Sequence, residues 1–404
     1  MNIKTDTWFA TCPKGLETLL ADELLSLGAT AARETVAGVH FQGPPSVARR
    51  VCLWTRLANR ILWPLASLPA ADGDVLYQGL REIDWGALFD ARSSIAVDFS
   101  GTNKMLRNTQ FGAQRCKDAV VDRFQATAGM RPSVDRRGAD VRINVRLDRD
   151  RARVSIDLSG GSLHQRGYRQ RGGAAPLKEN LAAAILLRAD WPGMAARGGA
   201  LIDPLCGSAT LLVEGAMMAA DIAPGLARER FGFEQLRLHD DAQWRAMLTD
   251  ARARAERGRA ARLPEIRGYD ADPGVIREAR ENIQRAGLQA AVRVSCRALA
   301  DFSKPTHRPL ETGLIVTNPP YGERLGEKKH LGGLYRLLGE RLAVHFGGWR
   351  AAVFTADLDL GRAIGLRSHK RYTLYNGTLE TYLLLFDLRD NVLRDDVVRD
   401  KASS

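Results

Sequence analysis

The spacing of apolar residues changes along the chain and divides it into a front part and a rear part. Up to about residue 160 the pattern mixes two periods: alternation predicts strands at 8–12, 94–99, 141–147 and 152–158, and helical spacing predicts helices at 16–25, 51–63 and 111–124. The last two strands are typical of a hairpin, with Val, Ile and Leu on one face and arginines on the other. We therefore expect an α+β front part.

From about residue 177 to 390, helical patterns alternate with short apolar stretches. These stretches lie at 200–203, 266–270, 292–296, 314–316 and 350–354, and a last pair at 370–375 and 381–386 flanks the turn Asn376-Gly377. Such alternation predicts a parallel, doubly wound sheet that closes on an antiparallel hairpin. Between the two parts, the Gly- and Arg-rich stretch up to residue 176 indicates a flexible tether. Within the rear part, the Arg/Ala-rich segment 245–262 indicates a solvated helix or, as the alternative, an insertion that faces RNA.

Composition narrows the class of protein. The 404 residues are 45% hydrophobic and 26% charged, as in ordinary globular proteins, and no stretch is apolar enough to span a membrane. The start lacks the pattern of a signal peptide, and the five scattered cysteines argue against a disulfide framework or a zinc site, which suits a cytoplasmic protein without a metal. The net charge is +12, and residues 104–171 hold 16 Lys/Arg against 7 Asp/Glu, an excess of nine. This excess favours a polyanionic partner or, more simply, an Arg-rich solvated surface.

Acidic residues follow three successive strands of the rear part. In doubly wound sheets ligands bind beyond the carboxyl ends of the strands, so Asp203, Asp270 and Asp301 mark a candidate ligand edge. The loop after Asp203 is not GxGxxG, which argues against a dinucleotide, and its Gly207 would let the backbone approach an adenosyl group. S-adenosylmethionine fits best: Asp203 would face its amino-acid end, Asp270 its ribose and Asp301 its adenine. The alternative is that each Asp only caps the next helix. The candidate cofactor residues are Asp203, Pro204, Cys206, Gly207, Ser208, Asp270, Asp301 and Asn318.

The fourth apolar strand ends in Asn318-Pro319-Pro320-Tyr321. The Asn318 side-chain oxygen and the Pro319 carbonyl can accept both N–H bonds of an exocyclic base amine, which directs its lone pair toward a methyl donor. Pro320 keeps the turn rigid, and Tyr321 can stack on a base that is single-stranded or flipped out. We therefore take these four residues as the candidate catalytic group.

The sequence resembles a known family at several motifs. Thr317-Asn-Pro-Pro-Tyr-Gly-Glu-Arg-Leu325, Asp203-Pro-Leu-Cys-Gly-Ser-Ala-Thr210, Ala175-Pro-Leu-Lys-Glu-Asn180 and the front segment Asn108-Thr-Gln-Phe-Gly112 look like those of THUMP-containing class I ribosomal RNA guanine-N2 methyltransferases. One departure is Asn180, where the family commonly has Thr. The resemblance covers the chain to about residue 390.

This resemblance implies an N-terminal ferredoxin-like region (1–60), a THUMP RNA-binding domain (61–160), a linker (161–176), a Rossmann-like catalytic domain with a seven-stranded sheet (177–390) and a flexible tail (391–404). In bacteria such proteins are sometimes fused to a second methyltransferase, and only the guanine-N2 half is implied here. The implied activity is methylation of a guanine N2 amine in large-subunit (23S) ribosomal RNA or its assembly precursor. The candidate RNA contacts are Arg107, Lys117, Arg142, Arg146 and Arg153.

Other functions remain open from the sequence. A tRNA guanine-N2 methyltransferase would share the chemistry, a DNA adenine-N6 methyltransferase would share the Asn-Pro-Pro-Tyr motif, and a non-catalytic RNA-binding assembly factor would share the fold. The front part argues against the DNA enzyme, and the intact motif with three strand-end acids argues against lost catalysis. The sequence gives no indication of the oligomeric state.

Overall fold

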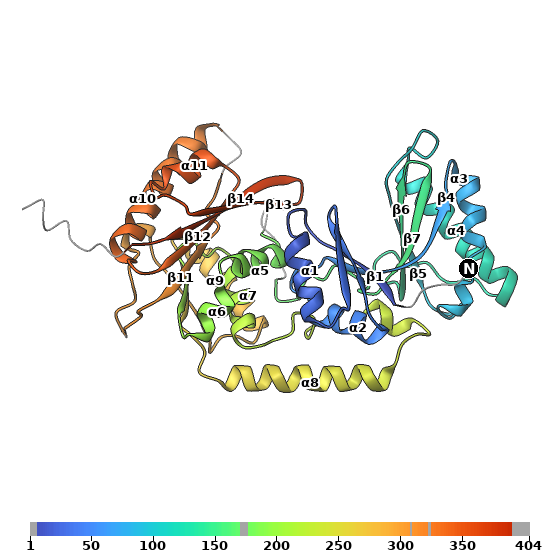
Figure 1. Ribbon diagram of the computed structural model, residues 1–404, viewed down its shortest axis with the longest axis horizontal. Helices are drawn as coiled ribbons and strands as arrows, with labels where there is room; N and C mark the ends of the chain where they lie inside the picture. The colour runs from blue at the N-terminus through green and yellow to red at the C-terminus, as the bar shows by residue number, and fades with distance from the viewer. Residues whose placement is uncertain (1–5, 170–176, 308, 322–324, 390–404) are drawn as a thin grey trace, which may run out of the picture. The chain divides into compact units, whose positions relative to one another are not determined.

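The computed structural model describes residues 6–169, 177–307, 309–321 and 325–389 (Figure 1). The chain divides into two compact units: unit 1 comprises Met1–Arg166 and Ala223–Ala251, and unit 2 comprises Gly167–Ile222 and Arg252–Ser404. The predicted tail at 391–404 and residues 170–176 of the predicted linker lie outside the described residues.

In the described part of unit 1, seven strands form one sheet in the order β2-β3-β1-β4-β7-β6-β5, here called the N-terminal sheet. Neighbouring strands are antiparallel except β5 and β6, which are parallel. The strands are β1 (Thr7–Thr11), β2 (Ala31–Thr35), β3 (Gly38–Gln42), β4 (Arg60–Pro69), β5 (Ile95–Ser100), β6 (Val141–Asp148) and β7 (Arg151–Asp157).

Helices pack on the apolar face of this sheet. They are α1 (Glu17–Ser26), α2 (Pro45–Trp54), α3 (Gly73–Arg81) and α4 (Thr109–Ala128), with a 3₁₀ turn η1 (Trp85–Ala87). The core between the layers contains the Trp8 and Trp63 rings, whose centroids lie 6.1 Å apart, and the Phe89 and Phe124 rings at 5.1 Å. The predicted hairpin is confirmed: β6 and β7 alternate between buried Val, Ile and Leu and more exposed arginines along most of their length.

The predicted helix over 51–63 is wrong in its second half. Helix α2 ends at Trp54, and β4 begins at Arg60. β4 is the longest strand of the N-terminal sheet and pairs with β1 on one side and with β7 on the other. The four-residue spacing of Leu53, Leu57 and Ile61 results from a helix end, a buried loop residue and a strand start that all face the same core. Here tertiary packing overrides a local helical pattern.

The predicted tether and the Arg/Ala-rich segment differ in how far they are buried. Leu163, Arg166 and Tyr168 are at most 4% exposed, so the described part of the predicted tether, up to residue 169, is not a free linker. The Arg/Ala-rich segment belongs to α8 (Asp241–Ala260) and is mostly exposed, with Ala251 and Ala255 buried, so its prediction as a solvated helix is confirmed. Near the start of this helix, Trp244 packs edge-on against Phe233 of the 3₁₀ turn η2 (Gly232–Gln235). The division between the units falls within this helix.

The described part of unit 2 contains a second sheet of seven strands in the order β10-β9-β8-β11-β12-β14-β13, here called the C-terminal sheet. Strands β8 to β12 are parallel, and β14 is antiparallel to both β12 and β13, as predicted. The strands are β8 (Ala200–Asp203), β9 (Ile266–Asp270), β10 (Val292–Cys296), β11 (Gly313–Thr317), β12 (Arg350–Thr355), β13 (Lys370–Asn376) and β14 (Leu379–Asp387). The predicted fold class is confirmed.

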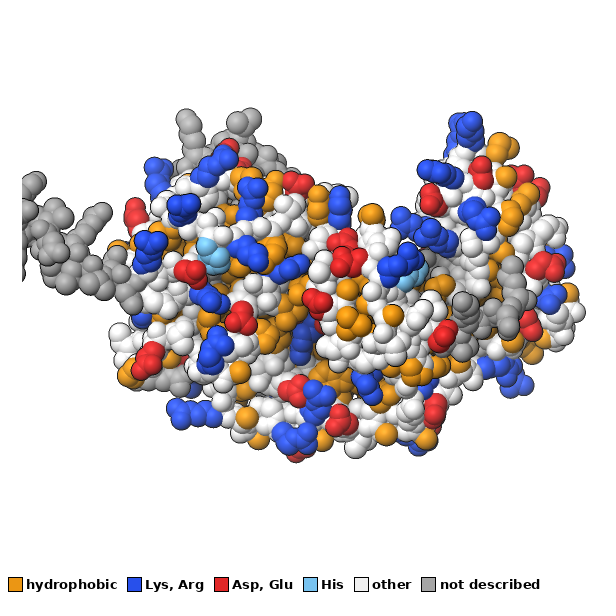
Figure 2. Space-filling model, in the orientation of Figure 1, with side chains coloured by type: hydrophobic (Ala, Val, Ile, Leu, Met, Phe, Trp, Pro, Cys, Tyr) orange, Lys and Arg blue, Asp and Glu red, His pale blue; other side chains and the backbone are white. Residues whose placement is uncertain are grey.

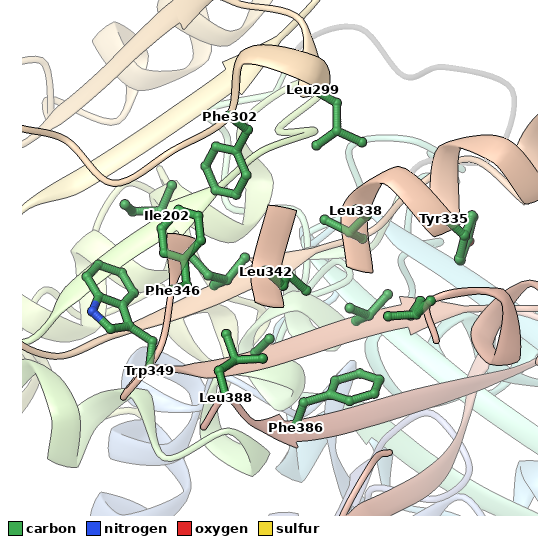
Figure 3. Packing of buried hydrophobic residues seen from close by; sticks show 14 of the residues in the cluster. Ile202, Leu299, Phe302, Tyr335, Leu338, Leu342, Phe346, Trp349, Phe386 and Leu388 are labelled. Carbon is green, nitrogen blue, oxygen red and sulfur yellow. The ribbon is translucent and has the colours of Figure 1, made fainter. Parts of the chain in front are cut away.

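Helices flank this sheet and enclose an aromatic core. The helices are α5 (Glu179–Arg188), α6 (Trp191–Ala196), α7 (Thr210–Ala219), α9 (Pro273–Arg285), α10 (Leu325–His345) and α11 (Leu358–Ala363), with a 3₁₀ turn η3 (Leu299–Asp301). Figure 3 shows Phe302, Phe346 and Trp349 packed together beside Ile202. The Phe302 and Phe346 rings are stacked with centroids 4.7 Å apart, so η3, which follows β10, is fixed to the end of α10.

Candidate active site

The candidate site lies where the order of the parallel strands reverses. Strand β8 is central, β9 lies on one side of it and β11 on the other, so the crevice between β8 and β11 is the switch point of the C-terminal sheet. The register pairs Ile315 with Ile202 and Gly268 with Asp203. The carboxyl ends of β8, β9 and β11 therefore bring Asp203, Asp270 and Asn318 to one edge.

Asp203 is the most buried acid of this edge. Asp203 is 1% exposed, and its Oδ1 accepts a hydrogen bond of 3.1 Å from the Leu205 amide. Burial raises the pKa of Asp203 from 3.8 to about 7; the Thr317 hydroxyl and the Leu205 amide act against this rise, and the charge of Asp270 adds to it. A carboxylate that is buried this deeply favours a cation placed against it.

The loop after Asp203 has an unusual backbone. Gly207 has φ +50° and Ala209 has φ +65°, both in the left-handed region, and Ala209 carries a side chain there. Asp270 stabilises this loop, because its Oδ2 accepts a hydrogen bond of 3.1 Å from the Gly207 amide. A Cβ at Gly207 would meet nothing within 4 Å, so the loop is open on that side.

The other predicted loop residues have different surroundings. Pro204 is buried, and Cys206 is fixed by its amide, which donates to the Tyr269 carbonyl at 2.8 Å, with its thiol against Gly268 of β9. Burial raises the pKa of the Cys206 thiol. The Ser208 carbonyl accepts a hydrogen bond of 2.9 Å from Asn282 of α9, so a second element determines the loop's shape.

The stretch after β11 presents one unsatisfied acceptor. Asn318 is half-buried, and its Oδ1 is a buried atom with no hydrogen-bond partner among the described residues. Pro319 is buried, Pro320 is exposed, and the half-buried Tyr321 packs against the aromatic core. Because an unpaired buried oxygen costs free energy, this arrangement is typical of a site that receives a donor.

Sequence reasoning missed a set of polar residues behind the loop. The Tyr168 hydroxyl donates to Glu214 Oε1 at 3.1 Å, and Arg169 lies 3.3 Å from the Thr210 hydroxyl and 3.6 Å from Glu179 Oε1. These contacts fix the start of α7, which follows the loop. Glycines and arginines surround Tyr168 and Arg169 in the sequence, and no pattern there indicates a buried role.

The remaining predicted site residues lie on other elements of the two units. Asp301 is exposed at η3, beyond the end of β10. In unit 1, Arg142, Arg146 and Arg153 extend from the same face of the N-terminal sheet. By contrast, Lys117 belongs to α4 and Arg107 to the loop before it. Arg142 has partners within the protein, since it pairs with Asp98 at 3.0 Å.

The described residues contain neither a candidate metal site nor a helix that could span a membrane. Residues 6–389, apart from the gaps given above, contain no group of three or more His, Cys, Asp or Glu side chains placed to hold a metal ion. Within the same residues, every helix is too short or too polar to cross a membrane.

Three family models match consecutive parts of the chain. They are the RlmL ferredoxin-like domain at residues 7–62, the THUMP domain at 70–157 and the RMKL-like methyltransferase domain at 166–384. The last of these covers more than half of the chain.

Two curated relatives carry the same name. "Ribosomal RNA large subunit methyltransferase K/L" of Cellvibrio japonicus is 52% identical over 98% of this chain and 54% of its own length, and that of Methylococcus capsulatus is 54% identical over 95% and 51%. The chain thus spans about half the length of the curated relatives it matches.

Solved structures match along the whole chain. A putative methyltransferase complexed with SAH is 31% identical, with a TM-score of 0.82 over 97% of this chain and all of that one. A possible methylase from Clostridium difficile has a TM-score of 0.84 at 28% identity over the same share. TrmN from Thermus thermophilus, at 20% identity and a TM-score of 0.65, shares the fold.

Proposed function

The chain belongs to the RMKL-like methyltransferase family, as its resemblance predicts, and from this premise we propose that it methylates the exocyclic N2 amine of a guanine in large-subunit ribosomal RNA, with S-adenosylmethionine as methyl donor. The observation that carries the proposal is the unpartnered Asn318 Oδ1 at the switch point, beside two strand-end carboxylates. The name of the curated relatives and the THUMP match support RNA of the large subunit as substrate.

The cofactor would bind along the edge formed by β8 and β9. The buried Asp203 carboxylate would neutralise the α-amino group of the cofactor, because burial has raised its pKa and a cation would lower it again. Asp270 would accept from the ribose hydroxyls while it still holds the Gly207 amide. The SAH in the related structure supports this class of ligand, since SAH is what S-adenosylmethionine becomes after methyl transfer.

Bound S-adenosylmethionine would supply a methyl group on a positively charged sulfonium. Asn318 Oδ1 would accept one N–H of the guanine amine, and the Pro319 carbonyl the other, which holds the nitrogen lone pair in line with that methyl group. The methyl group would pass from the sulfonium sulfur to the amine nitrogen, and Asn318 Oδ1 and the Pro319 carbonyl would help that nitrogen to release one proton to water. Pro320 would keep the turn rigid, and Tyr321, anchored on the aromatic core, would stack on the base.

The test uses radiolabelled S-adenosylmethionine and total RNA from a strain that lacks the gene. We expect label in N2-methylguanosine of large-subunit RNA, and a loss of at least about 100-fold in rate for Asn318→Ala, the usual cost of losing one transition-state acceptor or donor. Gln284→Ala removes an exposed amide on α9 and serves as the control. Cofactor affinity is measured in parallel, so that loss of binding is distinguished from loss of chemistry.

Each other outcome contradicts a specific part of the proposal. Label in tRNA would change the substrate and keep the chemistry, and methyladenosine would contradict the base assignment. Near-normal turnover by Asn318→Ala with unchanged cofactor affinity would contradict the role of the amide. No label in RNA or in assembling ribosomal particles would contradict the activity itself.

A further inference from the structure

One face of the N-terminal sheet is partly free of helices. Side chains that alternate with the core residues extend from it, and the register places those of six strands (β1, β2, β3, β4, β6 and β7) on this same side. We define the open face by six residues that are exposed or half-buried: Phe9, Arg33, His40, Ser67, Arg146 and Arg153.

Two arginines of the open face repel each other. Arg146 and Arg153 are direct neighbours across the β6–β7 pair, and like charges at directly opposed positions destabilise a sheet. Among the described residues, neither they nor Arg33 form an ion pair or a side-chain hydrogen bond. An anionic ligand lying between the two guanidinium groups would relieve this repulsion.

The charges of two arginines of the open face affect the pKa of His40. Burial lowers the pKa of His40, and the charges of Arg33 and Arg153 lower it further. The register places Arg33 of β2 directly opposite His40 of β3, and Arg153 lies on β7, with β1 and β4 between β3 and β7. Figure 2 shows the result: Lys and Arg side chains, with a histidine among them, line a hollow between the β2–β3 and β6–β7 hairpins.

An aromatic pair lies beside these arginines. The Phe9 and His40 rings have centroids 4.6 Å apart, and both residues are half-buried. The Phe9 ring lies over Gly38, where an added Cβ would come within 2.4 Å of it. The glycine thus lets the ring lie along the sheet, with one side toward solvent.

We propose that a single-stranded segment of the RNA substrate lies across the open face, with phosphates between Arg146, Arg153 and Arg33 and one base against the Phe9–His40 pair. Unpaired guanidinium groups next to a flat aromatic surface match the alternating phosphates and bases of a single strand, whereas a duplex offers no free base face. The inference rests on the proposed function only in taking RNA as the substrate. It extends the RNA-binding surface from β6 and β7 into the ferredoxin-like strands β1, β2 and β3.

The test measures binding of a fluorescein-labelled 12-nucleotide oligoadenylate to the full chain at several salt concentrations. Arg146→Gln/Arg153→Gln should lower the slope of log K against log salt by about 1.4, or about 0.7 for each lost phosphate contact. Phe9→Leu keeps an apolar side chain but cannot stack, and should weaken binding about five-fold or more without changing the slope. Arg50→Gln, which removes an exposed charge from α2 in the helical layer, should leave both unchanged.

The arginine variant keeps the proposal testable if Phe9→Leu fails to fold, because both arginines are exposed and form no ion pair in the described residues. An unchanged slope and affinity in that variant, relative to Arg50→Gln, would overturn the proposal, as would tighter binding of a 12-base-pair RNA duplex than of the single strand. Methyl transfer is assayed separately. If the wild-type protein methylates RNA and the variants have an unchanged KM, the proposed role of the open face is contradicted and the proposed activity is not. If the binding changes occur as expected but no RNA is methylated, the proposed activity is contradicted and the role of the open face is not.

Discussion

Replacing Asp203 with Asn should stabilise the protein and at the same time weaken cofactor binding. Asn keeps an oxygen that can accept from the Leu205 amide and removes a charge that is almost fully buried. The pKa of Asp203 is raised from 3.8 to about 7, a difference that corresponds to on the order of 4 kcal/mol between the ionised and neutral forms. This is an upper limit for the gain, because Asn forms weaker hydrogen bonds than a carboxylate.

The sign of the pH dependence follows from the raised pKa. Between pH 3.8 and about 7 the folded wild-type protein binds a proton at Asp203 that the unfolded chain has released, so its stability falls as the pH rises through this window. The variant lacks this proton. The free energy of unfolding of Asp203→Asn should therefore exceed that of the wild type by up to about 4 kcal/mol at pH 8 and approach it near pH 4.

Urea unfolding at pH 4, 6 and 8, followed by fluorescence, measures the difference, and calorimetric titration with S-adenosylmethionine measures affinity. We expect about 10-fold or greater loss of affinity at pH 8, from the loss of a charged hydrogen bond. Wild-type affinity should decline as the pH falls below about 7, because Asp203 becomes protonated. A variant that is less stable than the wild type at pH 8, or equally stable at all three pH values, would refute the reasoning.

Two further predictions concern Asp270 and the helical glycines. Asp270→Asn removes a charge that raises the pKa of Asp203, so the pH midpoint of cofactor binding in titrations should move lower; an unchanged midpoint would contradict their coupling. Gly258→Ala would place a Cβ 1.7 Å from the Ala220 carbonyl oxygen and should destabilise the protein by about 1 kcal/mol or more in urea unfolding, although Ala usually favours a helix. Gly333→Ala, with open space around it, is the matched control and should stabilise by up to about 1 kcal/mol; equal effects at both sites would contradict the packing argument.

The sequence predicts most of the candidate site, because parallel strands end at a common edge wherever they occur. Asp203, Asp270 and Asn318 follow short apolar strands, and knowing that those strands are parallel is enough to bring the three together. The orphaned oxygen of Asn318 could not be predicted, since it depends on which neighbours fail to reach it. The roles of Tyr168 and Arg169 could not be predicted either, because a Gly/Arg-rich context is also typical of unstructured chain.

The front part shows why local patterns fail. The predicted helix at 51–63 breaks at Trp54 because Trp63 packs against Trp8, a contact between residues far apart in sequence. The alternation of β6 and β7 was read correctly, because one face of that hairpin is buried along its whole length. What alternation could not show is the continuation of that face to β2 and β3, which depends on the strand order of the whole sheet.

The return of residues 223–251 to unit 1 has a consequence for how the chain is made. The N-terminal unit contains Phe231, Phe233 and Trp244 in its packing, yet these residues are synthesised after the first strand and helices of the other unit. At roughly 5–20 residues per second, the 85 residues from Arg166 to Ala251 take about 4–17 s to emerge. During that interval part of the core of unit 1 has still to be synthesised, so unit 1 cannot complete its packing until the first part of unit 2 has already emerged.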